Sequence, residues 1–189
     1  MPTSDKNPWK TTGKRLVYEN PWIRVVENDV VNPSGGRGIY GVVHFKRLAV
    51  GIIPVDGDGF TWLVGQYRYP TETYEWEIPE GGADPGETIE ECARRELAEE
   101  TGIAARSWDL ILEGMQLSNS TTDERAFAFL ARDLSFAEAA PEPTEELAVK
   151  RVPLAEAFAM VMRGEIRDGI SVAALLKLKA MIADGAIKL

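Results

Sequence analysis

The chain has 189 residues, 44% of them hydrophobic and 27% charged, and its formal net charge is −9. This length suits one domain, or one domain with an N-terminal addition, and the composition is that of an ordinary globular protein. The negative charge argues against broad binding to nucleic acids or anionic membranes, which require a basic surface. An acidic protein that binds a polyanionic substrate needs a local positive centre, which metal ions and a few arginines provide.

The single cysteine, Cys92, and the single histidine, His44, narrow the chemistry further. One cysteine cannot form an internal disulfide, which favours a reducing compartment. One histidine excludes a histidine metal cluster, and a Ser-His-Asp triad would depend on it alone. The N-terminus lacks the apolar segment of a signal peptide, and the longest apolar run, residues 48–55, is too short to span a bilayer. We therefore expect a cytoplasmic protein that does not bind membranes.

The N-terminal region is predicted to form antiparallel strands. Residues 1–14 are polar, and we expect them to be loose. Residues 16–31 are rich in β-branched and aromatic residues and are broken by an Asn-Pro pair, which predicts two short strands or one bent strand. A glycine-rich turn at 32–38 then leads to a strand over 39–45, so this segment is expected to be a hairpin.

A second strand pair is predicted over residues 47–55 and 60–69, which an Asp-Gly-Asp-Gly turn joins. Arg68 lies at the end of the second strand, where it suits bidentate pairing with a phosphate; a surface ion pair is the equally simple alternative. Glu77 lies in the extended segment that follows, on the strand face opposite its apolar neighbours.

The C-terminal part combines strands with helices. Residues 108–115 and 126–131 alternate as strands do, and the polar loop between them carries Glu124. Such loops often hold functional groups, so this loop could provide a catalytic carboxylate, although a solvated loop tip is equally compatible. Residues 137–146 have the composition of a linker. Residues 153–163 and 170–182 have helical periodicity. This order of elements predicts an α+β fold with a mixed sheet between helices.

The most informative stretch is residues 81–103, where a glycine-rich turn leads into a helix. Thr88 and Glu91 have the spacing of a capping box, and Gly102 stands where a helix ends with positive φ. At about 100° per residue, Glu96 and Glu100 fall on the same face as the apolar residues, and Glu99 borders that face.

Carboxylates on the inward face of a helix need a counter-charge, because burying an unpaired anion is costly. A hard divalent cation is the natural partner for oxygen ligands of this kind. The alternative without a functional role is an acidic surface helix, and the position of Glu96 and Glu100 on the helical wheel argues against it.

The segment resembles the Nudix box at each position that the motif fixes: Gly81, Glu87, Arg95-Glu96-Leu97, Glu99-Glu100 and Gly102-Ile103. This resemblance covers roughly residue 47 to the C-terminus. It implies an α/β/α sandwich with a mixed sheet, and hence an N-terminal strand region at 1–45 before a Nudix domain at 46–189. It also implies hydrolysis of a nucleoside diphosphate linked to another group, with Mg²⁺ or Mn²⁺ held by the box glutamates.

The N-terminal strands, the segment before the box and the loop after it are similar to the ADP-ribose and nucleotide-sugar pyrophosphatase branch of this family. That resemblance implies a homodimer in which N-terminal strands cross over and a purine stacks between aromatic rings of the two subunits. Trp22 and Tyr40 match those rings, although each is by itself more often a packing residue. Two departures leave the preferred sugar open: Gly41 replaces an acid of some relatives, and the loop after the box lacks a proline.

The same resemblance assigns roles to charged residues. The expected assignments are Arg68 and Glu77 as substrate contacts, Glu96, Glu99, Glu100 and the main-chain carbonyl of Glu80 as metal ligands, and Glu124 or Glu99 as the proton acceptor. Arg95 is expected to orient the box by pairing with Glu87 or Glu99.

The sequence thus predicts a Mg²⁺-dependent pyrophosphatase for ADP-ribose or a related nucleoside diphosphate sugar. The alternatives within the enzyme class are a nucleoside triphosphate pyrophosphatase and a coenzyme A pyrophosphatase. A protein that binds nucleotide sugars without cleaving them is the alternative outside it. Assays of hydrolysis with Mg²⁺ and a panel of these substrates distinguish all of these.

Overall fold

The computed structural model describes residues 6–137 and 146–189, so most of the predicted linker at 137–146 lies outside the described residues. The chain divides into two compact units. The first unit consists of Met1–Arg47 with Ser118–Glu124, and the second of Leu48–Leu117 with Arg125–Leu189.

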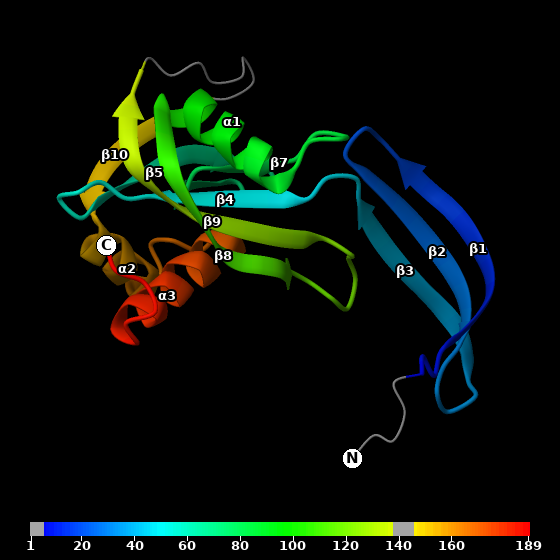
Figure 1. Ribbon diagram of the computed structural model, residues 1–189. Helices are drawn as coiled ribbons and strands as arrows, with labels where there is room; N and C mark the ends of the chain where they lie inside the picture. The colour runs from blue at the N-terminus through cyan, green and yellow to red at the C-terminus, as the bar shows by residue number, and fades with distance from the viewer. Residues whose placement is uncertain (1–5, 138–145) are drawn as a thin grey trace. The chain divides into compact units, whose positions relative to one another are not determined.

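The first unit is a three-stranded antiparallel sheet in the order β1-β2-β3 (Figure 1). Its strands are β1 (Lys10–Glu19), β2 (Ile23–Val31) and β3 (Arg37–Phe45). The prediction that residues 1–14 are loose is wrong from Lys10 onward, because β1 pairs with β2 along its length. The break between β1 and β2 falls at Asn20, whose side-chain oxygen accepts hydrogen bonds from the amides of Trp22 and Ile23.

The second unit contains two sheets and three helices. One sheet has the order β10-β5-β6, with β5 (Phe60–Arg68), β6 (Thr73–Glu77) and β10 (Ala148–Pro153). The other has the order β7-β4-β9-β8, with β4 (Ala49–Pro54), β7 (Glu80–Gly82), β8 (Ile103–Gln116) and β9 (Arg125–Phe136). The helices are α1 (Ile89–Thr101), α2 (Leu154–Arg163) and α3 (Gly169–Ala183).

The predicted pairing of residues 47–55 with 60–69 is wrong. The turn between them forms, since Asp56 accepts hydrogen bonds from the amides of Asp58 and Phe60. Beyond a single bridge from Val55 to Thr61, however, the two strands separate into different sheets. β4 instead pairs with β7 and, in parallel, with β9, where it is almost entirely buried. Strands buried on both faces commonly take such central positions.

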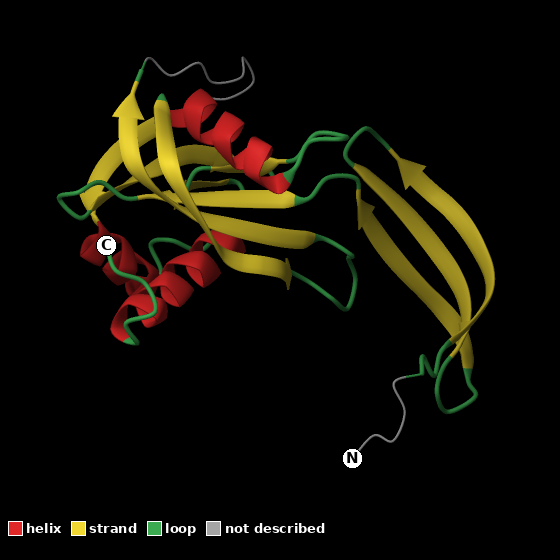
Figure 2. Cartoon of the chain, in the orientation of Figure 1, coloured by secondary structure: helices red, strands yellow, loops and turns green. Residues whose placement is uncertain are grey.

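Helices cover both faces of this β-structure (Figure 2). Along β4, Val50 and Ile52 pack in one apolar cluster with residues of α1, whereas Ile53 packs in a second cluster with residues of α2 and α3. This alternation follows from the two-residue period of a strand. The α+β sandwich with a mixed sheet that the sequence predicts is therefore confirmed.

None of the helices within residues 6–137 and 146–189 combines the length and the apolar character that a membrane crossing needs.

Candidate active site on helix α1 and the end of strand β5

Local sequence determines where α1 begins and ends. Thr88 accepts a hydrogen bond from the amide of Glu91, and the Glu91 carboxylate accepts one from the amide of Thr88. This is the predicted capping box. At the other end Gly102 has φ +68° and its amide donates to the carbonyl of Ala98. The predicted helix and both of its ends are confirmed.

The predicted faces of α1 are also confirmed. Ala93 and Leu97 are fully buried, and Glu100 lies with them at only 3% exposure. Glu91, Arg94 and Ala98 are exposed on the other side. Glu96 and Glu99 lie between these extremes, and the Glu96 side chain is the more buried of the two.

Two carboxylates of α1 meet strand β7. A Cβ atom added at Gly81 would lie 2.0 Å from Oε1 of Glu96, so the glycine leaves the room that this carboxylate occupies. The carboxylate of Glu100 accepts a hydrogen bond of 3.1 Å from the amide of Glu80. The helix and the turn that precedes it therefore bring acidic oxygens together at the glycine-rich segment.

Arg95 supplies positive charge to this acidic group. Its Nε and Nη2 donate to the two oxygens of Glu87, both at 2.9 Å. Its Nη1 donates to Glu96 at 2.7 Å and to Glu99 at 3.1 Å. All three guanidinium nitrogens are thus engaged, and the hydrogen bonds that Arg95 donates to Glu87 and Glu96 raise its pKa although burial opposes them. The arginine pairs with both partners that the sequence suggested and with Glu96 as well.

The donor set suits a hard divalent cation. Carboxylates of Glu96, Glu99 and Glu100 lie on one helix, and Glu80 lies beside them on β7. As they stand, no three His, Cys, Asp or Glu side chains within residues 6–137 and 146–189 are arranged to hold a metal. Two observations nevertheless fit a cation: Gly81 makes room for the Glu96 carboxylate, and Oε2 of Glu80 is buried without a hydrogen-bond donor.

Arg68, at the end of β5, is held by two further carboxylates. Its Nε donates to both oxygens of Glu77 at 3.0 Å, and its Nη2 donates to Glu77 and, at 3.0 Å, to Oε1 of Glu80. The Glu77 side chain is only 4% exposed, whereas that of Arg68 is 35% exposed. Glu77 therefore holds Arg68 from its buried side, and both remain predicted substrate contacts.

Glu80 lies in an unusual electrostatic position. Burial is the main reason why its pKa is raised well above the ordinary value, and the negative charges of Asp168 and Glu77 raise it further. Arg68 acts in the opposite direction. Glu80 was predicted as a ligand through its main-chain carbonyl alone, so its buried side chain adds an acidic group that sequence reasoning missed.

A cavity of about 520 Å³ lies beside Arg68. The residues that line it include two arginines, three carboxylates and two threonines: Arg68, Pro70, Thr71, Thr73, Glu75, Glu77, Arg167 and Asp168. Glu75, Arg167 and Asp168 were not singled out from the sequence. One signal in the sequence could have indicated Asp168, because it has the spacing of an N-cap with Ser171. Its carboxylate accepts a hydrogen bond of 2.8 Å from the amide of Ser171.

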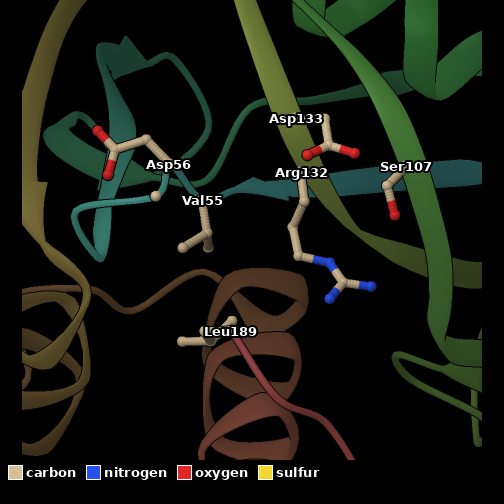
Figure 3. Close-up of a pocket in the computed structure, with 7 residues that line it drawn as sticks. Val55, Asp56, Ser107, Arg132, Asp133 and Leu189 are labelled. Atoms are coloured by element: carbon tan, nitrogen blue, oxygen red, sulfur yellow. The ribbon is translucent and has the colours of Figure 1, made fainter.

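A second cavity, of about 240 Å³, contains none of the predicted site residues (Figure 3). Arg132 and Asp133 of β9 line it together with Leu189. Arg132 donates to the carbonyl of Lys188 at 3.0 Å and pairs with Asp109 of β8. These contacts fasten the C-terminal residues to the sheet, which is a structural role.

The predicted base-stacking residues lie in the first unit. Trp22 is 62% exposed. Tyr40 is half-buried, contacts Trp9 edge to face at 5.4 Å between ring centroids, and donates its hydroxyl to the carbonyl of Ser120 at 2.6 Å. Trp22 thus has a largely accessible ring, whereas Tyr40 is already packed and hydrogen-bonded.

The loop that carries Glu124 is anchored on strand β3. Asp123 accepts hydrogen bonds from His44 at 2.6 Å and from the amide of Phe45 at 3.0 Å. Burial opposes ionisation of Asp123, but these hydrogen bonds hold its pKa below the ordinary value. The loop is therefore attached to the first unit, and Glu124 is half-buried within it.

The α+β sandwich thus carries a carboxylate-rich helix, an arginine that organises it and a second, cavity-lining arginine, an arrangement that suits an enzyme acting on phosphate groups. Comparison with known families agrees: the NUDIX domain matches residues 45–174, and the nucleoside diphosphate sugar hydrolase N-terminal domain matches residues 9–43. The chain belongs to the Nudix family, and it is a Nudix hydrolase.

Individual relatives cover most of the chain. It is 30% identical over 93% of its length to the ADP-ribose pyrophosphatase of Mycobacterium tuberculosis H37Rv, covering 86% of that protein. It is 33% identical over 84% of its length to the ADP-ribose pyrophosphatase of Bacillus subtilis 168, again covering 86% of the relative. A crystal structure of an ADP compounds hydrolase shares the fold, with a TM-score of 0.85, 24% identity and coverage of 98% and 100% of the two chains.

Proposed function

We propose that the protein hydrolyses the pyrophosphate bond of ADP-ribose or a related nucleoside diphosphate sugar, releasing a nucleoside monophosphate and a sugar phosphate. The observation that carries this proposal is the acidic face of α1, whose carboxylates meet the glycine-rich turn and are organised by Arg95. Two relatives named ADP-ribose pyrophosphatase, each aligned over most of the chain, support the substrate class.

Glu96, Glu99, Glu100 and the main-chain carbonyl of Glu80 are the groups that would hold Mg²⁺, or Mn²⁺ in its place. When bound, such an ion neutralises charge on the diphosphate and stabilises the charge that develops as the bond breaks. Arg95 donates to Glu96 and Glu99, so it fixes these side chains along the helix before any ligand arrives.

The remaining chemistry falls to side chains of this chain. Water forms a new bond to one phosphorus, the bridging P–O bond breaks, and the water proton passes to a carboxylate. Glu99 and Glu124 are the proposed acceptors, and a carboxylate within hydrogen-bond reach of water can fill this role. Arg68 contributes a fixed positive charge to a phosphate oxygen, since a guanidinium binds phosphate well.

The N-terminal strand region, residues 1–45, is proposed to form a homodimer interface that brings Trp22 and Tyr40 to a purine. Exposed apolar side chains on β1, on β3 and in the turn between β1 and β2 support this proposal, because large exposed apolar groups favour association. They are Leu16, Val17, Tyr18, Trp22 and Ile39, each more than half exposed. Light scattering on the purified protein gives its mass in solution, and a monomer at all concentrations would contradict the dimer.

A substrate panel tests the function itself. The purified protein is incubated with Mg²⁺ and ADP-ribose, GDP-mannose, UDP-glucose, dGTP or coenzyme A, and the products are separated. We expect the nucleoside diphosphate sugars to be cleaved fastest, to a nucleoside monophosphate and a sugar phosphate. Preferred cleavage of dGTP or coenzyme A would replace the proposal with one of those activities, and binding without phosphate release would indicate a sensor. Cytoplasmic location, also proposed, is tested by cell fractionation.

A further inference from the structure

The cavity beside Arg68 is lined by residues that can form hydrogen bonds with sugar hydroxyls and with a phosphate. Among residues 6–137 and 146–189, none that lines it carries an aromatic ring, so it lacks the aromatic platform on which nucleobases commonly stack. Its polar groups are carboxylates and threonine hydroxyls, which accept hydrogen bonds from sugar hydroxyls, and arginines, which bind phosphate. A volume of about 520 Å³ lies within the usual range for a small-molecule site.

Arg68 is the group that a phosphate would meet. Its Nε and Nη2 are engaged by Glu77 and Glu80, whereas no hydrogen bond to the described part of the chain engages Nη1. The guanidinium is planar and rigid, so carboxylates on one side fix the direction of the remaining donor. Because Arg68 lines the cavity and is partly exposed, Nη1 is the donor available to a ligand there.

The other lining residues are held in place before a ligand binds. Thr73, Glu75 and Glu77 alternate along β6 and line the cavity together. Arg167 pairs with Glu75 through Nε at 3.0 Å and through Nη2, which joins β6 to the segment that leads into α3.

The first turn of α3 is attached just as firmly. The hydroxyl of Ser171 accepts a hydrogen bond of 3.0 Å from the amide of Ile78, and Asp168 caps the same turn through the amide of Ser171. Asp168 is thereby fixed in the wall of the cavity. A site whose side chains are fixed in advance loses little conformational entropy on binding.

We infer that this cavity binds the sugar-phosphate half of the substrate, with Arg68 donating to the phosphate and Asp168 and the threonines facing the sugar hydroxyls. The inference rests on the proposed hydrolysis of nucleoside diphosphate sugars and makes it more specific, since it assigns the two halves of the substrate to different places. Arg167 and Glu75 are then positioning residues that hold the wall containing Asp168.

Binding of isolated product halves tests the inference without catalysis. Titration calorimetry measures ribose 5-phosphate and, separately, AMP binding to the wild-type protein, Arg68→Lys and Asp168→Asn. Lysine keeps the charge next to Glu77, and asparagine keeps an oxygen that can cap Ser171, so both variants are expected to fold. We expect ribose 5-phosphate affinity to fall about tenfold in each variant and AMP affinity to change less than twofold, since tenfold corresponds to one lost hydrogen bond to a charged group.

Arg163→Lys is the matched control, because Arg163 pairs with Glu156 and Glu165 on the surface and does not line the cavity. It should bind both compounds as the wild type does. The inference is overturned if ribose 5-phosphate does not bind the wild type, if it binds all variants equally, or if AMP is the compound that loses affinity. Failure of the wild type to cleave any nucleoside diphosphate sugar would instead overturn the proposed function, and the binding data would still decide whether the cavity takes a sugar phosphate.

Discussion

Arg95 and Arg68 differ in how completely their carboxylate partners occupy them. Arg95 donates through all three nitrogens to Glu87, Glu96 and Glu99. Its Nη2 also donates to the carbonyl of Gly82. Arg68 is fixed just as firmly by Glu77 and Glu80, yet no hydrogen bond from residues 6–137 or 146–189 engages its Nη1, and it lies beside a cavity. This difference is the basis of the proposed roles, in which Arg95 organises the acidic helix and Arg68 presents positive charge to a ligand.

The largest expected effect lies on the acidic helix. Glu100→Gln replaces a buried carboxylate but keeps an oxygen that can accept the hydrogen bond from the amide of Glu80. We expect kcat for ADP-ribose to fall by about 10²-fold or more, as for loss of one group that stabilises transition-state charge. Steady-state kinetics measure the loss, and circular dichroism checks that the fold is intact. Unaltered turnover would contradict the metal-binding role.

Arg95→Ala tests whether Arg95 is an organiser. It leaves the partly buried Glu87, Glu96 and Glu99 without their main counter-charge, so we expect the free energy of unfolding to fall by about 2 to 3 kcal/mol. Urea denaturation with and without Mg²⁺ measures it. If the carboxylates bind the cation, Mg²⁺ should restore more stability to this variant than to the wild type. Equal responses to Mg²⁺ would indicate that these glutamates do not hold the ion.

Glu75→Gln tests the wall of the cavity beside Arg68 through pH. The hydrogen bond from Arg167 is the main cause that lowers the pKa of Glu75 below its ordinary value of 4.5. A lowered native pKa stabilises the fold above the unfolded-state pKa, and this contribution is lost as pH falls through the native value. Because Arg167 is mostly exposed, we expect the variant to be about 1 kcal/mol less stable at pH 7.

That difference should shrink below pH 4.5 and vanish once Glu75 is protonated in the native state. Denaturation at a series of pH values measures it against Glu165→Gln, a control in which a surface glutamate paired with Arg163 is neutralised. A difference between wild type and Glu75→Gln that persists unchanged to pH 2 would show that the ion pair is not its cause.

The smallest expected effect is the labelling of Cys92, whose sulfur lies 3.6 Å from Nη2 of Arg95. Burial, followed by the negative charge of Glu96, raises the pKa of Cys92 to about 12. At pH 8 only about one thiol in 10⁴ is then ionised, and thiols react as thiolates. We expect iodoacetamide to label the protein in urea but hardly at all in the native state. Rapid native labelling would show that the thiol is accessible and would contradict its burial.

Helix α1 and the cavity beside Arg68 differ in how much of them the sequence predicts, for a physical reason. The helix of Arg95 was predicted with its caps and its acidic face, because capping boxes and helical periodicity act between residues a few positions apart. The cavity beside Arg68 was not predicted, because Glu75 and Arg167 are brought together over 92 positions of sequence. The wrong pairing of residues 47–55 with 60–69 has the same origin, since β4 prefers distant β9 to its neighbour in sequence.

The sequence by itself determined the local structure: an acidic helix between a glycine-rich turn and a terminal glycine, built from local hydrogen bonds and a 3.6-residue period. Only the tertiary structure decided which groups remain available to a ligand. Whether an arginine is fully occupied or keeps a free donor depends on the carboxylates that distant strands bring to it, and such non-local pairings leave little trace in the order of residues.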